Sequence, residues 1–423
     1  MKYKKSKYNI FVPYEDSKTI IFNSLTGSIG LFDEETMEKY NNDTFSLEET
    51  ELLLKKGILV DCGYDELSKV NNDRVNGIKY TKGKFIRVWT TSACNARCYY
   101  CFEKGIATTK MTKETADQLV VFIDNMLNDG DKLTFEWFGG EPLLNVEIID
   151  YIIDKLEPIC VQKKCRLTST IISNGSLITE EIVNKMIKKW NVSYIQITLD
   201  GDKYDYDRVK NYFNPKKFNF DKIIENIKLL SKNNIHVSVR MNYDTNNYDS
   251  LNNLIDYLYK ELAGFKNIFY YVYPIWSSLN DKDDSRFISQ SFADDKLLSL
   301  LQKIASYKLT PIRELARLNY KVNQCVSCNI NSYTVLPDGK LAKCSETFRQ
   351  IIGDIWNGVT DTDAYNYWTN TGLDNKCEEC VYLPLCQGGC RSSHFTEMPQ
   401  CFVYKDILDE ILKWYVSDLK KHK

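Results

Sequence analysis

Three cysteines that could bind a metal cluster lie close together in the first quarter of the chain. Cys94, Cys98 and Cys101 are spaced as C-x3-C-x2-C, directly after the apolar, β-branched run FIRVWTT, which predicts a buried strand. Three thiolates on one tight loop can bind three irons of a cubane iron–sulfur cluster and leave the fourth iron free to bind a small molecule. The loop could instead belong to a zinc site or hold reduced structural cysteines, although zinc needs a fourth ligand and no histidine lies nearby in the sequence.

Composition limits the classes of protein to which the chain could belong. Its 423 residues suffice for two or three domains, and 55 Lys+Arg stand against 57 Asp+Glu. A net charge of −2 gives no electrostatic basis for binding nucleic acid or an anionic membrane surface, and no long apolar run predicts a membrane span. We therefore expect a cytoplasmic protein, whose 14 cysteines are reduced and serve mainly as metal or cluster ligands.

The first part of the chain, residues 1–75, is expected to form a small separate module. Short strands are predicted within NIFVPY and TIIFNSLTGSIGLFD, and helices over 34–40 and 46–60, the second opening with a serine cap and a glutamate three residues on. Strands beside short helices suggest a winged-helix-like module, with an extension of the main domain as the alternative. The polar, glycine-containing segment 71–84 is the expected linker.

From residue 85 the pattern of strand, loop and helix repeats six times. Such units build a parallel sheet with helices outside it, and six are too few for a full eight-unit barrel, so the expected fold is α/β with a partial (β/α)6 TIM-like barrel. A further helix is expected near 293–309, followed by a turn-rich, cysteine-dense remainder that cluster ligation would organise. Strands are predicted at 85–91, 133–140, 167–175, 194–201, 236–244 and 268–276, and helices at 113–127, 145–159, 179–190, 220–233 and 250–262.

Polar side chains and glycines follow these predicted strands, at the sheet edge where ligands bind in such folds. Each group alone is an ordinary turn, but together they describe a pocket for a molecule with amine, carboxylate, ribose and aromatic base. Two glycines could let the backbone approach a ligand, a glutamate could bind the amine, Ser-Asn could bind the ribose, and an arginine the carboxylate. The residues are Gly139, Gly140, Glu141 and Pro142 after the second strand, Ser173 and Asn174 after the third, Arg240 beside Asn242 on the fifth, and Tyr100 for the base.

The cysteine loop together with GGEP, SNG, LDG and VRMN resembles the radical S-adenosylmethionine (SAM) enzymes over residues 85–276. The resemblance implies that Cys94, Cys98 and Cys101 hold a [4Fe–4S] cluster whose open iron chelates the amino and carboxylate groups of SAM. It further implies that one electron from the cluster cleaves SAM to a 5′-deoxyadenosyl radical, which abstracts hydrogen from an unactivated C–H bond. The radical SAM domain would span residues 80–290.

The C-terminal cysteines resemble the SPASM domain of radical enzymes that modify peptides, here expected over residues 310–423. They follow as C-x10-G-x4-C and then C-x2-C-x5-C-x3-C-x10-C, with one additional cysteine before them; two zinc ribbons are the alternative. The resemblance implies two auxiliary [4Fe–4S] clusters, three clusters in all. Cys325, Cys328, Cys344 and Cys390 would bind the first, with Cys325 the least secure ligand, and Cys377, Cys380, Cys386 and Cys401 the second. Cys62, Cys160 and Cys165 fit no cluster and are expected to be buried small side chains.

The N-terminal module resembles, by size and order of elements, the PqqD-like leader-recognition element of many peptide maturases.

Together with the SPASM-like cysteines, this resemblance implies maturation of a ribosomally made precursor peptide with a leader, most simply by a cysteine thioether cross-link of the sactipeptide or ranthipeptide type. The expected electron donor is a low-potential protein such as flavodoxin or ferredoxin. Alternatives are a carbon–carbon cross-linking or epimerising maturase, an anaerobic sulfatase-maturating (formylglycine-forming) enzyme, and a non-enzymatic iron–sulfur electron carrier. In the sulfatase-maturating family an aspartate follows the cysteine of the Gly-x4-Cys segment, where this chain has Ser345.

Overall fold

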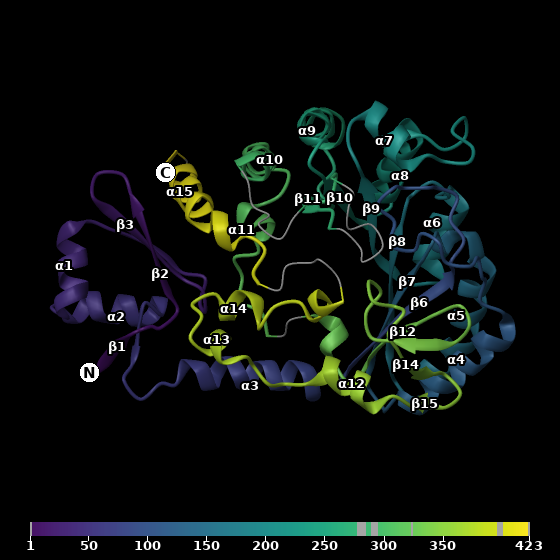
Figure 1. Cartoon of the computed structure of the whole chain (residues 1–423), viewed down its shortest axis with the longest axis horizontal. Coiled ribbons are helices and arrows are strands. Elements are labelled where there is room, and N and C mark those ends of the chain that lie inside the picture. The colour runs from purple at the N-terminus through teal and green to yellow at the C-terminus, as the bar shows by residue number, and fades with distance from the viewer. Residues whose placement is uncertain (1, 277–284, 289–294, 323–324, 396–400, 422–423) are drawn as a thin grey trace.

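The computed structural model describes residues 2–276, 285–288, 295–322, 325–395 and 401–421 (Figure 1). Its centre is a ten-stranded sheet in which six parallel strands are hydrogen-bonded in chain order. The six predicted strands are therefore confirmed, as an α/β fold with a large, mostly parallel sheet. The strands are β6 (Gly83–Thr91), β7 (Lys132–Gly139), β8 (Arg166–Ser173), β9 (Val192–Leu199), β10 (His236–Tyr243) and β11 (Ile268–Pro274).

Helices cover the outer face of these strands, as the right part of Figure 1 shows. Isoleucine and leucine side chains on the outward face of the strands, such as Ile195 and Ile197, are fully buried against apolar helix faces such as Ile223 and Ile227. The inward face of the same strands carries half-buried polar side chains, because it lines the site. The helices are α4 (Lys113–Met126), α5 (Val146–Gln162), α6 (Glu180–Lys188), α8 (Phe220–Lys232) and α9 (Tyr248–Leu262), and α7 (Lys203–Lys210), which the sequence pattern did not predict.

The N-terminal module contains a three-stranded antiparallel sheet packed against two helices, at the left of Figure 1. Ser46 and Glu49 form the predicted capping box, but the helix they begin ends at Lys56, because Gly57 adopts a left-handed C-cap. The chain then returns as a strand that pairs with the N-terminus. The elements are β1 (Tyr3–Lys5), β2 (Asn9–Tyr14), β3 (Lys18–Asn23), β4 (Ile29–Phe32), α1 (Glu34–Asn42), α2 (Leu47–Lys56) and β5 (Leu59–Asp61).

The expected linker at 71–84 was wrong, because helix α3 (Glu66–Lys79) runs through most of it. Asp65 caps this helix, and its buried side chains recur every four residues, at Glu66, Val70, Arg74 and Ile78. Two of the four are charged, so the buried face has no apolar signature in the sequence. In Figure 1, α3 extends from the N-terminal module along the cysteine-dense C-terminal part toward α12 (Thr362–Thr369).

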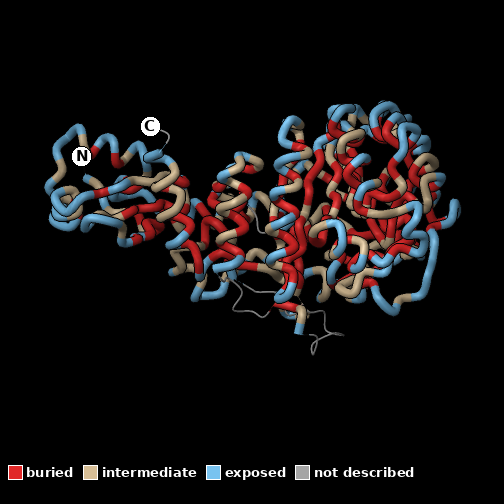
Figure 2. The backbone as a smooth tube through the Cα atoms, turned by 90° about the horizontal axis from the view of Figure 1, so that it is seen from above, coloured by how far each residue is buried: buried red, intermediate tan, exposed pale blue. Residues whose placement is uncertain are grey.

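The C-terminal part joins the barrel sheet directly. Its strand β12 pairs in parallel with β6, and three antiparallel strands extend the sheet beyond it. The last helix, α15, contacts β2 and β3 of the N-terminal module. Figure 2 shows buried backbone in both the barrel and the smaller N-terminal part. The elements are α10 (Asp295–Ser306), within the helix expected at 293–309, α11 (Ile312–Leu315), β12 (Ser332–Val335), β13 (Lys340–Ala342), β14 (Ile351–Asp354), β15 (Gly358–Val359), α12, α13 (Asn375–Glu378), α14 (Leu383–Cys386) and α15 (Leu408–Lys421). Within the described residues, no helix combines the length and the apolarity that crossing a membrane requires.

Candidate cofactor and cluster sites

The cysteine loop lies immediately after β6, at the carboxyl end of the parallel strands. Burial raises the pKa of Cys94 and of Cys101 to about 12 and also raises the pKa of Cys98. The three thiols also interact electrostatically with one another. Metal ligation would deprotonate such thiols. The structure therefore brings the three thiols near one another, and their ligation of one cluster stays a prediction.

Two glycines at the end of β7 let its backbone pack closely against the cysteine loop. A Cβ added at Gly139, which has φ +114°, would lie 2.2 Å from the Thr91 carbonyl oxygen, and one at Gly140 would lie 2.3 Å from the Ala93 carbonyl oxygen. The amides of Gly140 and Glu141 donate hydrogen bonds to those two carbonyls, at 3.0 and 2.8 Å. The glycines were expected to admit a ligand, but the backbone that they let approach is that of the cysteine loop.

Glu141 joins the ends of two neighbouring strands. Its fully buried carboxylate accepts hydrogen bonds from the Ser173 hydroxyl at 2.9 Å and the Asn174 amide at 2.8 Å. Burial raises the pKa of Glu141 to about 7, although these hydrogen bonds work to lower it. The Asn174 side chain in turn donates to Asn95, in the cysteine loop, at 2.8 Å. Pro142 begins the short 3-10 helix Pro142–Asn145 directly after Glu141. The structure thus brings the predicted residues of the second and third strand ends together beside the cysteines.

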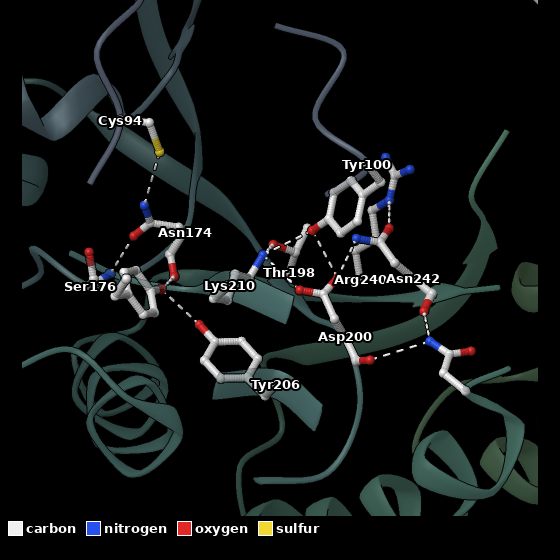
Figure 3. A network of polar contacts seen from close by, with 12 residues as sticks. Cys94, Tyr100, Asn174, Ser176, Thr198, Asp200, Tyr206, Lys210, Arg240 and Asn242 are labelled. Carbon is white, nitrogen blue, oxygen red and sulfur yellow. Dashed lines mark hydrogen bonds and ion pairs between the residues drawn. The ribbon is translucent and has the colours of Figure 1, made fainter. Parts of the chain in front are cut away.

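A buried polar network around Lys210 and Asp200 lies near the cysteine loop and includes Tyr100 of that loop (Figure 3). The Lys210 ammonium lies 2.9 Å from the Asp200 carboxylate and donates hydrogen bonds to the Tyr100 hydroxyl at 3.0 Å and to Thr198 at 2.6 Å. The Tyr100 hydroxyl donates to Asp200 at 2.9 Å. Tyr100 was predicted to lie against an aromatic base, and its hydroxyl is held by this network.

Arg240 reaches the same network through Asn242. The Arg240 Nε donates to the Asn242 side-chain oxygen at 2.8 Å, and the Asn242 amide donates to Asp200 at 2.7 Å. The Arg240 guanidinium also lies 4.2 Å from the centre of the Tyr273 ring. Arg240, which was expected to bind the carboxylate of the ligand, is therefore linked to Tyr100 through Asn242 and Asp200.

Lys210 is a site residue that the sequence reasoning missed. Burial works to lower the pKa of Lys210, but the Asp200 carboxylate and the Cys98 thiol outweigh it and raise that pKa well above its usual range. It is the last residue of α7, whose sequence KYDYDRVK is mostly charged and has only Tyr206 and Val209 as buried apolar residues. Only its position ten residues after the predicted strand-end Asp200 could have drawn attention to it.

The first C-terminal set of cysteines borders a cavity of about 310 Å³. Cys325, Cys344 and Cys390 line it from the C-terminal part, while Arg87 of β6 and Tyr273 of β11 line it from the barrel. Cys328 is buried next to it, and its thiol interacts electrostatically with those of Cys325 and Cys390. The structure therefore places the four predicted ligands of this set at or next to one cavity, which Cys386 and Cys401 of the second set also line, and Cys325 is exposed.

The second set lines a smaller cavity of about 180 Å³, to which Cys377, Cys380, Cys386 and Cys401 all contribute. The thiol of Cys386 interacts electrostatically with the other three. Among the described residues, no three histidine, cysteine, aspartate or glutamate side chains converge closely enough to hold a single metal ion. Cubane ligands are instead spread around four irons, so that finding concerns single-ion sites.

Buried cations surround the two sets of thiols. Arg74, Arg391 and Lys343 are buried or half-buried, and their hydrogen bonds go to backbone carbonyl oxygens. In the described part of the chain, the buried Nε atoms of Arg74 and Arg391 have no hydrogen-bond partner. Buried cations without carboxylate partners are costly. Since a cubane bound by four thiolates carries net negative charge, both the donor set and its surroundings fit such clusters.

The three remaining cysteines lie away from these sites. Cys160 is buried in α5 as expected, and Cys165 is half-buried and donates to the Asn128 carbonyl at 3.2 Å. Cys62 is exposed, so its expected burial was wrong; it follows the short strand β5 at the surface of the N-terminal module.

Comparisons with known proteins identify a family model and several similar proteins. Residues 89–258 match the family model of the radical SAM superfamily. The radical SAM cyclopropyl synthase TigE of Paramaledivibacter caminithermalis is 24% identical over 290 residues, which are 60% of this chain and 60% of that protein. A cysteine-type anaerobic sulfatase-maturating enzyme of Clostridium novyi is 24% identical over 341 residues, 73% of this chain and 88% of that enzyme.

Two solved structures share the fold. The sulfatase-maturating enzyme anSMEcpe with bound AdoMet and Cp18Cys peptide has a TM-score of 0.61 at 15% identity, covering 80% of this chain and 98% of that one. Streptococcus suis SuiB bound to its precursor peptide SuiA has a TM-score of 0.53 at 13% identity, covering 95% and 98%. Residues 89–258 thus match the radical SAM family model, and the chain is similar in sequence to a radical SAM cyclopropyl synthase and a sulfatase-maturating enzyme, and in fold to anSMEcpe and SuiB.

Proposed function

We propose that this protein is a radical SAM maturase of a ribosomally made peptide, which installs an intramolecular cross-link, most simply a cysteine thioether. The observation that carries the proposal is the 310 Å³ cavity, which is lined both by barrel residues such as Arg87 and Tyr273 and by cysteines of the C-terminal part. A cavity of that size accommodates one or two amino-acid side chains rather than a folded domain. A segment of peptide could therefore reach between a SAM site and an auxiliary cluster.

In this proposal Cys94, Cys98 and Cys101 hold the SAM-binding cluster, and the two C-terminal sets of cysteines hold auxiliary clusters that accept or conduct electrons. When bound, SAM and its cluster supply a carbon-centred radical that abstracts hydrogen from an unactivated C–H bond. The SAM contacts come from Tyr100, Gly139, Gly140, Glu141, Pro142, Ser173, Asn174 and Arg240.

The chain's own residues position these groups. The buried Lys210–Asp200 pair holds the Tyr100 hydroxyl through hydrogen bonds, and Lys210 adds positive charge next to Cys98. Glu141 joins the two strand-end loops that would face the amino group and ribose of SAM. Rigid placement of this kind gives reacting groups a high effective concentration.

The N-terminal module would bind the leader of the precursor. Among the described strands, β4 pairs only with β3, so its outer edge could accept the leader as an additional strand. Tethering the leader there would raise the concentration of the core peptide at the cavity. The likeness to SuiB, which extends over 95% of this chain, supports a peptide substrate.

A short cysteine-bearing precursor encoded beside this protein provides the test. Anaerobic incubation with SAM and a low-potential donor such as flavodoxin or ferredoxin should lower its mass by about 2 Da per cross-link, the two hydrogens lost. Loss of iodoacetamide labelling identifies a thioether, whereas retained labelling indicates a carbon–carbon bond, and an unchanged mass with an inverted residue indicates epimerisation. Formylglycine in a sulfatase peptide would instead support the sulfatase-maturating alternative. An unmodified precursor would refute the proposed function.

A further inference from the structure

We propose that Arg74 is a positioning residue shared by the two auxiliary cluster sites, where its guanidinium stabilises the reduced state of the clusters. The inference rests on the proposed function, because it requires both C-terminal sets of cysteines to hold clusters. It assigns a role to helix α3, which runs from the N-terminal module alongside the C-terminal part (Figure 1).

Arg74 is a buried cation that interacts with cysteines of both sets. Its side chain is 2% exposed and interacts electrostatically with Cys328 of the first set and with Cys377 and Cys386 of the second. Its two terminal nitrogens donate to the carbonyls of Thr371 and Gly372, in the segment leading to Cys377. A single guanidinium is thus anchored to the backbone beside both sets.

In the described part of the chain, no carboxylate forms an ion pair with Arg74. Burial and the neighbouring guanidinium of Arg391 lower the pKa of Arg74, and the charges that oppose this effect are those of cysteine thiolates. Lys321 has a similar electrostatic environment. Burial and the neighbouring Arg317 lower the pKa of Lys321, while Cys386 and Cys325 oppose this effect. Buried like charges are unfavourable unless negative charge lies between them. Thiolate-bound clusters supply that charge.

Helix α3 also covers the second set of cysteines. Val70, one turn before Arg74, packs against Leu383 of α14, and Cys377 packs against the same apolar group. One turn after Arg74, the carbonyl of Ile78 accepts a hydrogen bond from the amide of Ile330, two residues beyond Cys328. The helix is therefore fixed on both sides of Arg74, so its guanidinium has little freedom to move away.

This placement has a redox consequence. Reduction of an oxidised [4Fe–4S] cluster adds one electron from a one-electron reductant such as dithionite, without bond cleavage or a leaving group, and makes the cluster more negative. A fixed positive charge nearby favours that state, and at short distance in a protein interior the interaction is substantial. Arg74 should therefore raise the midpoint potential of at least one auxiliary cluster.

The test uses the full chain with Cys94, Cys98 and Cys101 changed to alanine, so that only auxiliary clusters contribute. Arg74→Gln keeps one amide donor but removes the charge, and Arg74→Lys keeps the charge. Lys79→Gln removes an exposed cation from the same helix and serves as the control. Iron and sulfide content and an EPR-monitored redox titration are measured for each protein.

We expect Arg74→Gln to disfavour one-electron reduction by about tenfold, which is about 59 mV, while Arg74→Lys and Lys79→Gln titrate like the parent. Unchanged potentials with full iron in Arg74→Gln would overturn the inference. If Arg74→Gln loses iron, Arg74→Lys distinguishes the effect of charge from that of the side chain. Iron content and potentials like those of the parent in Arg74→Lys would support the role of charge, and an equal loss of iron in Arg74→Lys would overturn the inference. A parent without iron would refute the auxiliary clusters themselves and this inference with them.

Discussion

The ammonium of Lys210 lies 2.9 Å from the carboxylate of Asp200, and both side chains are 2% exposed. The pair joins the end of α7 to the end of β9 and holds the hydroxyl of Tyr100, which lies between Cys98 and Cys101 in the chain. A buried ion pair with further hydrogen bonds is a strong constraint on geometry, because neither charge can be left alone at low cost. The cysteine loop is thereby fixed to the strand end that faces the proposed SAM site.

Lys210→Met should lower the free energy of unfolding by about 3–5 kcal/mol, because it leaves the Asp200 carboxylate buried and unpaired. Urea denaturation of the metal-free protein measures this loss, and adding Asp200→Leu should restore part of it. Lys203→Met breaks an exposed ion pair on the same helix and should cost less than about 1 kcal/mol. Equal effects of the two single changes would contradict the account.

Gly140→Ala should release iron from the SAM-binding site. The new Cβ would lie 2.3 Å from the Ala93 carbonyl oxygen and 2.7 Å from that of Ser92, so the cysteine loop must move. We expect iron to fall by about 4 of about 12 atoms per chain, the content of one [4Fe–4S] cluster. Gly264→Ala is the control, because no atom lies within 4 Å of its added Cβ. Full iron in Gly140→Ala would show that the loop does not depend on this contact.

Glu141 should make the metal-free protein less stable as the pH rises from about 4.5 to about 7. Burial raises the pKa of Glu141 in the folded state to about 7, so over that range the folded state holds a proton that the unfolded state has lost. The contribution of Glu141 to the free energy of unfolding is fully present below the pKa of the unfolded state. It falls by about 3 kcal/mol in total as the pH rises to the pKa of the folded state.

Denaturant unfolding at pH 5 and pH 7.5, compared between wild type and Glu141→Gln, measures this contribution. The wild type should lose more stability than the variant on going to the higher pH, since glutamine does not titrate. The same pH dependence in both proteins would assign the effect to other groups.

The iron content of cysteine variants should show that the two C-terminal sets of cysteines bind separate clusters. Cys328→Ala and Cys386→Ala should each lower the iron content by about 4 atoms per chain, and the double variant by about 8, because the two residues serve different clusters. Cys62→Ala should leave the content unchanged, since this thiol is exposed on the N-terminal module. A double variant that loses no more iron than either single variant would show one shared site.

Much of the barrel could be predicted because its signals are local. Each parallel strand combines a buried apolar run with a polar or glycine end, and the helices between them have a clear apolar face. The capping residues Ser46 and Glu49 are equally local, since they are three residues apart and act on the same helix end. The strand-end residues of the candidate site could be predicted from the order of strands and helices along the chain, because parallel strands end at one edge of a sheet.

The features that were missed depend on contacts between distant segments. Helix α3 buries Glu66 and Arg74, whose partners lie at the N-terminus and near Gly372, so its sequence resembles a solvated linker. Lys210 is buried through Asp200 and Tyr100, and nothing in the charged sequence around it indicates burial. The pairing of β12 with β6 joins residues more than 240 positions apart and has no local signature.

Release of 5′-deoxyadenosine tests the central claim most directly. Anaerobically reconstituted protein, reduced with dithionite in the presence of SAM, should yield 5′-deoxyadenosine, measured by chromatography with mass detection. Cys98→Ala should yield none, because the SAM-binding cluster loses one of its three proposed ligands, whereas Cys62→Ala should match the wild type. Absence of 5′-deoxyadenosine from reduced, iron-replete wild-type protein would contradict radical SAM chemistry and leave the electron-carrier alternative.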